Sequence, residues 1–282
     1  MDEYPGTTTV GEIGDDNPLE RMAEYTAGGD KLHMAYTFDL LNAPHSVRYI
    51  HEVLERFQRL AGDAWPCWAT SNHDVVRSAS RWGAGEDPTA YPKVALAMLC
   101  SLRGSVCLYQ GEELGLPEAD VPFERIQDPY GKVLWPEFKG RDGCRTPMPW
   151  NDSEHGGFSN VEPWLPMEAS HRDMAVSRQQ DDANSTLNAL RNMLAFRRQH
   201  PALVDGDLTL VDVGETLLGF SRQKGDETLL CVFNLTAEAQ TVNLPLAIEC
   251  DLQGHGFITQ RDGNLLTLPA YQAAFMRVAH NS

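Results

Sequence analysis

Apolar segments alternate with helical patterns through the first 115 residues, and this alternation limits the fold more than any other feature of the chain. The apolar runs are short, as buried strands are, and the apolar positions in the segments between them recur at helical spacing. The predicted strands are 7–10, 33–41, 63–74 and 105–110. The predicted helices are 18–27, one of about four turns that begins at residue 46, and 91–102.

A strand that is followed by a helix and then by another strand needs a crossover connection, so neighbouring strands run parallel. Near-continuous apolar strands indicate burial on both faces of the sheet. A last helical pattern at 185–199 ends at Pro201. The sequence therefore predicts an α/β domain over residues 1–205.

Residues 116–184, which we call the excursion, interrupt this rhythm. The segment is marked by Pro, Gly, Asp and Trp and shows little periodicity. It is long for a plain loop, and long irregular segments in compact domains are usually functional. We therefore expect the excursion to be either a functional loop or a small embedded subdomain.

The pattern changes after residue 205 to short strands separated by turns. Residues 224–226 (KGD) and 262–263 (DG) are hairpin signals. This pattern predicts a compact antiparallel β-sandwich domain over residues 206–282. Its predicted strands are 208–213, 217–221, 228–235, 240–244, 257–259, 265–268 and 273–278.

The charge balance excludes two classes of partner. The chain carries 40 acidic and 23 basic residues, with a formal net charge of -17. Such a surface repels phosphate backbones and anionic lipids, so we expect neither nucleic acid nor membrane as a partner. A neutral, polar small molecule fits this balance better.

The cysteines and the N-terminus suggest a reducing compartment. The six cysteines form no CxxC pair and no cluster with metal-ligand spacing, so we expect buried, reduced thiols and no metal site. Residues 1–6 (MDEYPG) lack the basic-then-apolar order of a secretory signal, and the apolar run 94–102 is too short to span a bilayer. We expect a cytoplasmic protein.

Polar groups gather where one predicted strand ends. The apolar run 65–68 leads into residues 71–74 (SNHD), which place an amide, an imidazole and a carboxylate together. Active sites of α/β folds lie at such strand ends. An ordinary polar turn is the alternative, because Ser, Asn and Asp favour turns through local hydrogen bonds.

Two carboxylates suggest a chemistry. Glu12 falls at the carboxyl end of the first predicted strand and Asp74 at the end of the third, so they can face each other across a barrel rim. Hydrolysis of a glycosidic bond needs one carboxylic acid to protonate the leaving oxygen and other carboxylates to offset positive charge on the sugar. Alternatively, both cap helices or turns, and His73 forms a structural pair with Asp74 instead of contacting sugar hydroxyls.

Four motifs carry a family resemblance. Residues 10–14 (VGEIG) resemble the segment around the acid/base Glu after the fifth barrel strand of the α-amylase superfamily of retaining glycoside hydrolases. Residues 71–74 resemble the motif after its seventh strand, and residues 110–115 (QGEELG) the segment after its eighth. Residues 140–150 (GRDGCRTPMPW) are similar to a run in the α-glucosidase and oligo-1,6-glucosidase branch.

The resemblance implies a role for each matching residue. Glu12 is the implied general acid/base, and Asp74 the carboxylate that stabilises the transition state and holds sugar hydroxyls. His73 and Arg145 are the implied substrate-binding residues, and Arg145 could instead fix the excursion by an ion pair. No cofactor is implied.

Other residues near the implied site are weaker candidates. We expect Arg141, Phe38 and Glu112 to support the site rather than contact a substrate. We expect Trp150, Phe158 and Trp164 to pack the excursion, although one of them could stack on a sugar.

The resemblance covers the second half of the family's catalytic domain only. The family's nucleophile is an Asp after the fourth strand, ahead of the motif that contains Glu12. A full (β/α)₈ unit takes about 250 residues, and only four strand-helix pairs are evident. We therefore predict a partial TIM barrel, strands five to eight, that is inactive alone because it lacks the nucleophile. Its two open strand edges invite pairing with a complementary N-terminal barrel half, so the chain is either a truncation or one half of a split enzyme.

The implied activity is the release of glucose from short α-linked oligosaccharides. A transglycosylase or sucrose-processing relative on the same fold is one alternative, and product analysis on maltose, isomaltose and sucrose separates the two. A non-catalytic carbohydrate-binding scaffold is another. The joint presence of Glu12, His73 and Asp74 argues against it, because a scaffold has no chemical need for them.

Overall fold

The computed structural model describes residues 4–42, 46–60, 62–83 and 86–279. Parallel strand pairing dominates its first part and antiparallel pairing its last part. The predicted parallel and antiparallel segments are thus both present.

Four short parallel strands follow one another in the order of the sequence. Strand β1 (Val10–Ile13) pairs with β2 (Met34–Thr37), and β3 (Cys67–Trp68) pairs with β4 (Ser105–Val106). A parallel bridge between Ala35 and Pro66 joins the two pairs. Helices α1 (Pro18–Thr26), α2 (Val47–Leu60) and α4 (Ala90–Ser101) lie between the strands in sequence.

The helices follow from their sequence patterns. Helix α1 begins at Pro18, whose ring presets the helical φ, and Gly28 follows its end with a φ of +74°. Helix α2 buries one face, which is formed by Ile50, Val53, Leu54 and Phe57. Most residues of helix α4 are buried, as expected for a helix that is apolar on nearly all sides.

The strands differ most from their predictions. The predicted strand 63–74 is regular only at residues 67–68. After residue 68, backbone groups of this segment form hydrogen bonds with side chains instead of with a neighbouring strand. Arg81 Nη2 donates to the carbonyl of Thr70 (2.5 Å), and the Asn72 side chain accepts from the backbone amides of Asp74 and Val75. The predicted strand 105–110 ends at Val106, and the first strand spans 10–13 instead of 7–10.

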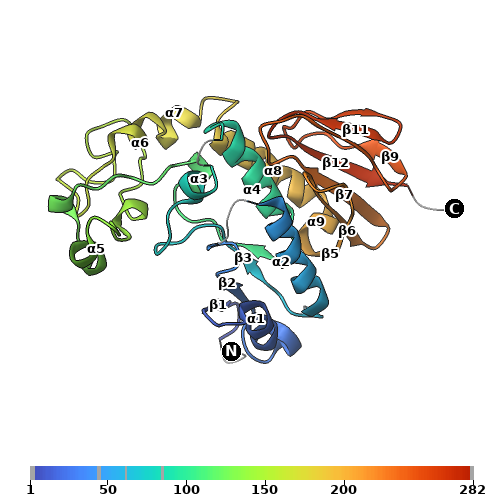
Figure 1. The fold of residues 1–282 in the computed structure, drawn as a ribbon, viewed down its shortest axis with the longest axis horizontal. Coiled ribbons are helices and arrows are strands. Elements are labelled where there is room, and N and C mark those ends of the chain that lie inside the picture. Colours follow the sequence, from blue (N-terminus) through green and yellow to red (C-terminus); the bar gives the residue numbers. More distant parts are fainter. Residues whose placement is uncertain (1–3, 43–45, 61, 84–85, 280–282) are drawn as a thin grey trace.

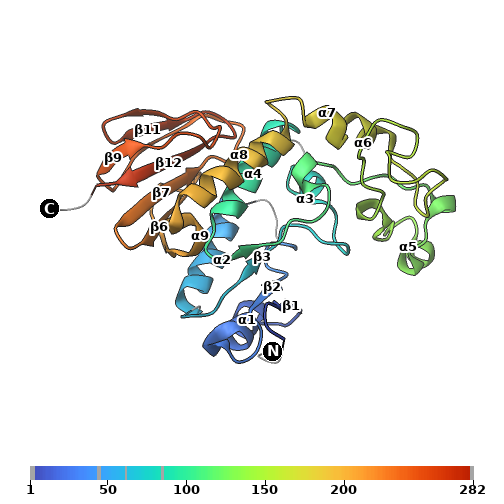
Figure 2. The ribbon, with the colours of Figure 1, turned by 180° about the vertical axis from the view of Figure 1, so that it is seen from behind.

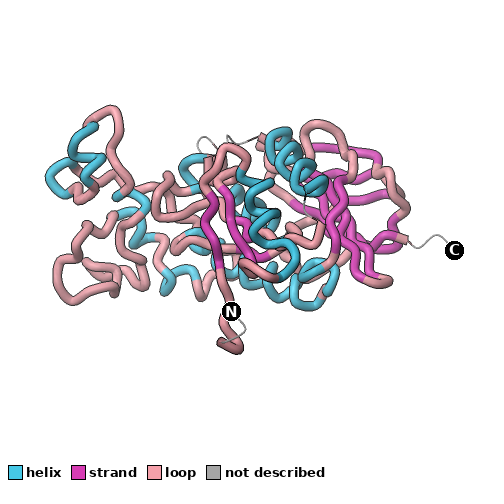
Figure 3. Tube along the Cα trace, turned by 90° about the horizontal axis from the view of Figure 1, so that it is seen from below, coloured by secondary structure: helices cyan, strands magenta, loops and turns pink. Residues whose placement is uncertain are grey.

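The excursion contains mostly loop, with three short helices: α5 (Pro129–Leu134), α6 (Ala169–Asp173) and α7 (Val176–Gln179) (Figure 3). Helix α8 (Thr186–Gln199) follows it and packs against α4. The Ser185 side chain caps α8 by accepting a hydrogen bond from the Asn188 amide. Helix α9 (Pro201–Asp205) leads into the last part of the chain.

Two antiparallel sheets form the C-terminal part. The larger has the order β5-β6-β7-β12-β9 and the smaller the order β10-β11-β8. The strands are β5 (Asp207–Leu210), β6 (Leu218–Lys224), β7 (Glu227–Phe233), β8 (Gln240–Asn243), β9 (Ile248–Asp251), β10 (Gln260–Asp262), β11 (Leu265–Leu268) and β12 (Ala273–Val278).

Three details of this part differ from the prediction, and one is that strand β10 follows the predicted segment 257–259 instead of coinciding with it. Residues 257–259 are not a strand, because the amides of Phe257 and Ile258 donate to the side chains of His255 and Gln272. Strand β9 was not predicted, and its residues, with a Glu, a Cys and an Asp, are only partly buried or exposed. It lies at the edge of the larger sheet, where such residues are common.

The larger sheet buries both faces. Along β7, Leu229, Cys231 and Phe233 belong to a core that also contains residues of α2, α4 and α8. The alternate residues Leu230 and Val232 belong to a second core shared with the smaller sheet. Because successive strand residues point to opposite faces, this one strand joins the two parts of the molecule.

Figure 1 shows the resulting arrangement, with the excursion at one end, α4 and α8 in the middle and the two antiparallel sheets at the other end. Figure 2 shows the same order from behind. Among the described residues, no helix combines the length and the apolar character that crossing a bilayer requires.

Candidate active site

A tight loop after β3 presents two of the predicted site residues, His73 and Asp74. Asn72 is buried, and its Oδ1 accepts from the amides of Asp74 (2.8 Å) and Val75 (3.1 Å). Ser71 is also buried, and its Oγ accepts from the Ser78 amide. These bonds turn the chain sharply, so that His73 and Asp74 are exposed at its tip.

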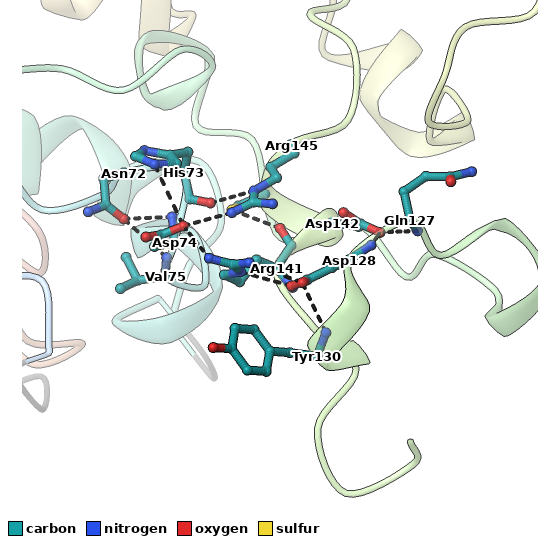
Figure 4. A network of polar contacts seen from close by, with 11 residues as sticks. Asn72, His73, Asp74, Val75, Gln127, Asp128, Tyr130, Arg141, Asp142 and Arg145 are labelled. Carbon is teal, nitrogen blue, oxygen red and sulfur yellow. Dashed lines mark hydrogen bonds and ion pairs between the residues drawn. The ribbon is translucent and has the colours of Figure 1, made fainter. Parts of the chain in front are cut away.

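Asp74 is the centre of a cluster of basic side chains (Figure 4). Its Oδ1 accepts from Arg145 Nη2 at 2.7 Å and from Arg141 Nη1 at 3.1 Å. The His73 Nε2 lies 3.7 Å from the same oxygen. The Asp74 side chain is nevertheless 40% exposed, so its carboxylate combines strong partners with access to a ligand.

Arg145 connects the excursion to this loop. Its Nε donates to the carbonyl of His73 at 2.7 Å, while its Nη2 reaches Asp74. The predicted ion pair of Arg145 is thus present, and its partner is Asp74 itself. The structure therefore brings three of the four predicted site residues, His73, Asp74 and Arg145, into direct contact.

Arg141 is held from the opposite side by Asp128. The guanidinium donates to both Asp128 oxygens, from Nε to Oδ2 (2.8 Å) and from Nη2 to Oδ1 (3.0 Å), and it lies over the Tyr130 ring. The Asp128 side chain is fully buried. The hydrogen bonds from Arg141 hold the pKa of Asp128 well below its usual range, and the same pairing raises the pKa of Arg141.

Asp142 anchors the segment that contains Asp128. Its Oδ2 accepts from the amides of Gln127 (2.6 Å) and Asp128 (2.8 Å), and its side chain is buried. The backbone of residues 127–128 is therefore held by contacts other than the Asp128–Arg141 pair.

Glu12 lies within strand β1, not beyond its end, because the β1–β2 ladder continues to Ile13. It is exposed and pairs in register with Tyr36, whose hydroxyl is hydrogen-bonded to it. Burial and this carboxylate raise the pKa of Tyr36 to about 12, while Asn72 lowers it. Glu12 thus reaches the Asp74 loop through Tyr36 and Asn72.

Glu112 lies beneath the Asp74 loop. Its Oε1 accepts from the hydroxyls of Thr70 (2.7 Å) and Ser78 (2.9 Å), and its Oε2 accepts from the Tyr109 amide (2.8 Å). Both oxygens are used inside the fold, as expected of a supporting residue. Phe38 lies close to Gly14, directly after β1.

The expectation that three aromatic residues pack the excursion is wrong. Trp150, Phe158 and Trp164 are 53%, 55% and 68% exposed. All three side chains are therefore more than half exposed, whereas Ile126, Met148 and Leu165 of the same segment are buried.

The expectation that all cysteines are buried is also wrong. All six are free thiols, but Cys107 and Cys250 are exposed. A hydrogen bond from Cys67 lowers the pKa of Cys107 to about 7. The same hydrogen bond raises the pKa of Cys67, and burial raises it further. Among the described residues, no group of three or more His, Cys, Asp or Glu side chains could hold a metal ion.

Three residues of this site were missed in the sequence. Asp128 lies in an aperiodic segment, where no pattern separates a structural carboxylate from a solvated one. Asp142 lies within the motif of residues 140–150, but the motif alone assigns it no role. Tyr36 was read as part of an apolar run. The alternation of a strand could have placed Tyr36 opposite Glu12, but only once the register of the two strands was known.

Comparisons with known proteins agree with the motifs. Residues 1–206 match the alpha amylase catalytic domain, and residues 208–275 match the maltogenic amylase C-terminal domain. A probable alpha-glucosidase of Rhizobium meliloti (strain 1021) is 49% identical over 99% of this chain and 51% of its own length. An oligo-1,6-glucosidase of Parageobacillus thermoglucosidasius is 27% identical over 84% of this chain and 48% of its own length.

A solved structure is similar over the whole chain. The crystal structure of an alpha-glucosyl transfer enzyme matches with a TM-score of 0.93 and 47% identity, covering 99% of this chain and 52% of that one. The chain thus spans about half the length of the relatives it matches. With both domain matches and a relative at 49% identity, the chain belongs to the α-amylase family, in the branch of the α-glucosidases and oligo-1,6-glucosidases.

Proposed function

We propose that residues 1–282 form the acid/base half of a retaining α-glucosidase that releases glucose from short α-linked oligosaccharides. The observation that supports this most is the cluster in which His73, Arg141 and Arg145 surround one oxygen of Asp74. Such a cluster presents a fixed carboxylate and several donors to a neutral polyol. The names of the two curated relatives suggest the substrate class.

In this proposal each residue has a defined step. Glu12 protonates the oxygen of the leaving sugar and later removes a proton from the attacking water. Asp74 accepts hydrogen bonds from sugar hydroxyls and offsets the positive charge that develops on the ring. His73 and Arg145 donate to hydroxyls of the same glucosyl unit.

The nucleophile of this mechanism comes from outside residues 1–282. We propose that β1 to β4 are strands five to eight of a (β/α)₈ barrel, and that residues 206–282 are a C-terminal β-sandwich domain that packs against it. Within the described residues, β1 and β4 each have one strand neighbour, which leaves one edge of each open to a complementary N-terminal half. The relatives, which are about twice as long, support this proposal.

Glucosyl transfer is a second candidate function. The structurally similar protein at 47% identity is described as an alpha-glucosyl transfer enzyme. Transfer and hydrolysis share the glucosyl-enzyme step and differ only in whether water or a sugar hydroxyl takes the glucosyl group.

The test is to complete the enzyme and analyse its products. The chain is co-expressed with the N-terminal portion of the Rhizobium meliloti relative and incubated with maltose, isomaltose and sucrose. Glucose as the only new product supports hydrolysis, and longer or rearranged saccharides support transfer. We expect Glu12→Gln and Asp74→Asn to lower kcat by about 10²- to 10⁴-fold, and Glu55→Gln, on the exposed face of α2, to change it less than about twofold.

Two results contradict the proposal. A folded, completed enzyme that is inactive on all three sugars rules out both candidate activities. If it still binds glucose in titration calorimetry, the non-catalytic scaffold gains support. If affinity is then unchanged by Asp74→Ala, the sugar binds away from the cluster.

A further inference from the structure

Asp128 is a buried carboxylate for which the proposed mechanism has no step. Its side chain is completely shielded from solvent, and burying a charge is unfavourable unless the charge is paired and hydrogen-bonded. Here both oxygens accept from the Arg141 guanidinium, and Oδ2 also accepts from the Arg141 backbone amide. This bidentate geometry restricts the rotation of the guanidinium as well as its position.

The remaining contacts of Arg141 point to Asp74. The guanidinium uses Nε and Nη2 on Asp128, which leaves Nη1 to donate to Asp74 Oδ1 at 3.1 Å. The Tyr130 ring lies below it, with the guanidinium carbon 5.3 Å from the ring centre (Figure 4). Arg141 is thus held on two sides and presents one donor to the exposed carboxylate.

The arrangement selects one oxygen of Asp74. Arg141, Arg145 and His73 all approach Oδ1. Because both arginines donate to Oδ1, they hold the carboxylate in one orientation through this oxygen. Misplacement of such a group by about 1 Å can cost about 10²-fold in rate.

We propose that Asp128 is a positioning residue, which acts through Arg141 to orient the Asp74 carboxylate toward a bound glucosyl unit. This inference rests on the proposed function for its effect on rate. The Asp128–Arg141–Asp74 linkage itself is independent of that function. Asp142 contributes by fixing the backbone of residues 127–128.

A structural role of Asp128 can be separated from this positioning role. Asp128 also caps helix α5, because its Oδ1 accepts from the Tyr130 amide at 3.2 Å. Asn caps helices about as well as Asp, so Asp128→Asn keeps the cap and the side-chain volume while it removes the charge. The matched control is Asp120→Asn, which breaks the exposed pair of Asp120 with Lys139 (2.6 Å) in the same excursion.

The first experiment is a double-mutant cycle in the completed enzyme. We expect Asp128→Asn to lower kcat/KM for maltose by about 10- to 100-fold, Arg141→Met to lower it at least as much, and Asp120→Asn to change it less than about twofold. If Asp128 acts through Arg141, the double variant is no worse than Arg141→Met alone. Losses that multiply in the double variant overturn the inference.

The second experiment does not depend on activity. The 282-residue chain is labelled with carboxyl-¹³C aspartate, and the Asp74 signal is assigned with Asp74→Asn. We expect Asp128→Asn to shift the Asp74 carboxyl signal and Asp120→Asn to leave it in place. An unmoved Asp74 signal in folded Asp128→Asn overturns the inference. A shifted signal in a chain whose completed enzyme is inactive supports the linkage and rejects the proposed function.

Discussion

At the scale of single residues, two neighbouring thiols show how one hydrogen bond changes the pKa of a side chain. Cys67 begins β3 and Cys107 directly follows β4, and the Cys107 amide donates to the carbonyl of Trp68 at 2.8 Å. Cys67 is buried and Cys107 is exposed. The hydrogen bond from the Cys67 thiol stabilises the Cys107 thiolate and lowers its pKa to about 7.

We expect this contact to set the rate at which Cys107 is alkylated. Because the thiolate is the nucleophile, the rate of Cys107 alkylation by iodoacetamide is expected to rise with pH and reach half of its maximum near the pKa of about 7. Cys67→Ala removes the donor, so the pKa rises and the rate at pH 7 falls. Peptide mass spectrometry measures this, with Cys250, the other exposed thiol, as internal control. An identical pH profile in Cys67→Ala contradicts the explanation.

The candidate site was predictable residue by residue only where a motif named it. His73, Asp74 and Arg145 were all expected, and they lie in contact. Asp128 was not expected, since its partner Arg141 lies 13 positions away in a segment without periodicity. For Glu12 the residue was named but its place in the strand was wrong. Strand length depends on partner strands that a local pattern does not show.

At the scale of elements, the long helices were predictable and the short strands were not. Helices α4 and α8 lie within one or two residues of their predicted bounds, and α2 begins one residue after its predicted start, because each repeats apolar positions over several turns. The strands β3 and β4 have only two residues each. Their ends are set by side-chain hydrogen bonds, such as that of Arg81 to Thr70, which connect residues far apart in the sequence.

Helix α8 offers a direct test of capping. Ser185 Oγ accepts from the Asn188 amide at 3.1 Å and donates to the Gln179 carbonyl at 2.8 Å. We expect Ser185→Ala to lower the free energy of unfolding by about 1 kcal/mol, because it leaves a helix amide without a partner. Urea titration measures the loss. Ser185→Asp restores the cap and is expected to recover most of it, and a loss below about 0.3 kcal/mol in Ser185→Ala would count against this role.

At the scale of the molecule, the two parts of the chain share a core. The sequence pattern suggested a sandwich with a core of its own, yet β7 is apolar at five successive positions, and these alternate between the two cores. A strand that is apolar without alternation indicates burial on both faces. A local pattern does not show which elements cover the second face of β7. These elements include α4 and α8, which belong to the preceding part of the chain.

Phe196 on α8 is the residue at which this shared core can be tested. The centroid of its ring lies 5.1 Å from that of the Phe275 ring of β12 and 5.2 Å from that of the His255 ring. We expect Phe196→Ala to destabilise both parts together, by about 3 to 5 kcal/mol, because it leaves a cavity between them. Val133→Ala, at a side chain that is 79% exposed, is expected to cost less than about 0.5 kcal/mol.

The chain itself supplies separate probes for the two parts. All six tryptophans precede residue 206, so their fluorescence reports on the first part, and hydrogen exchange of the β7 amides reports on the second. If the core is shared, Phe196→Ala moves the urea midpoint of the fluorescence change and lowers the protection of the β7 amides by the same free energy. If only one probe detects a loss of stability, the sheets fold independently of α8. The contact between Phe196 and Phe275 then contributes little to holding the two parts together.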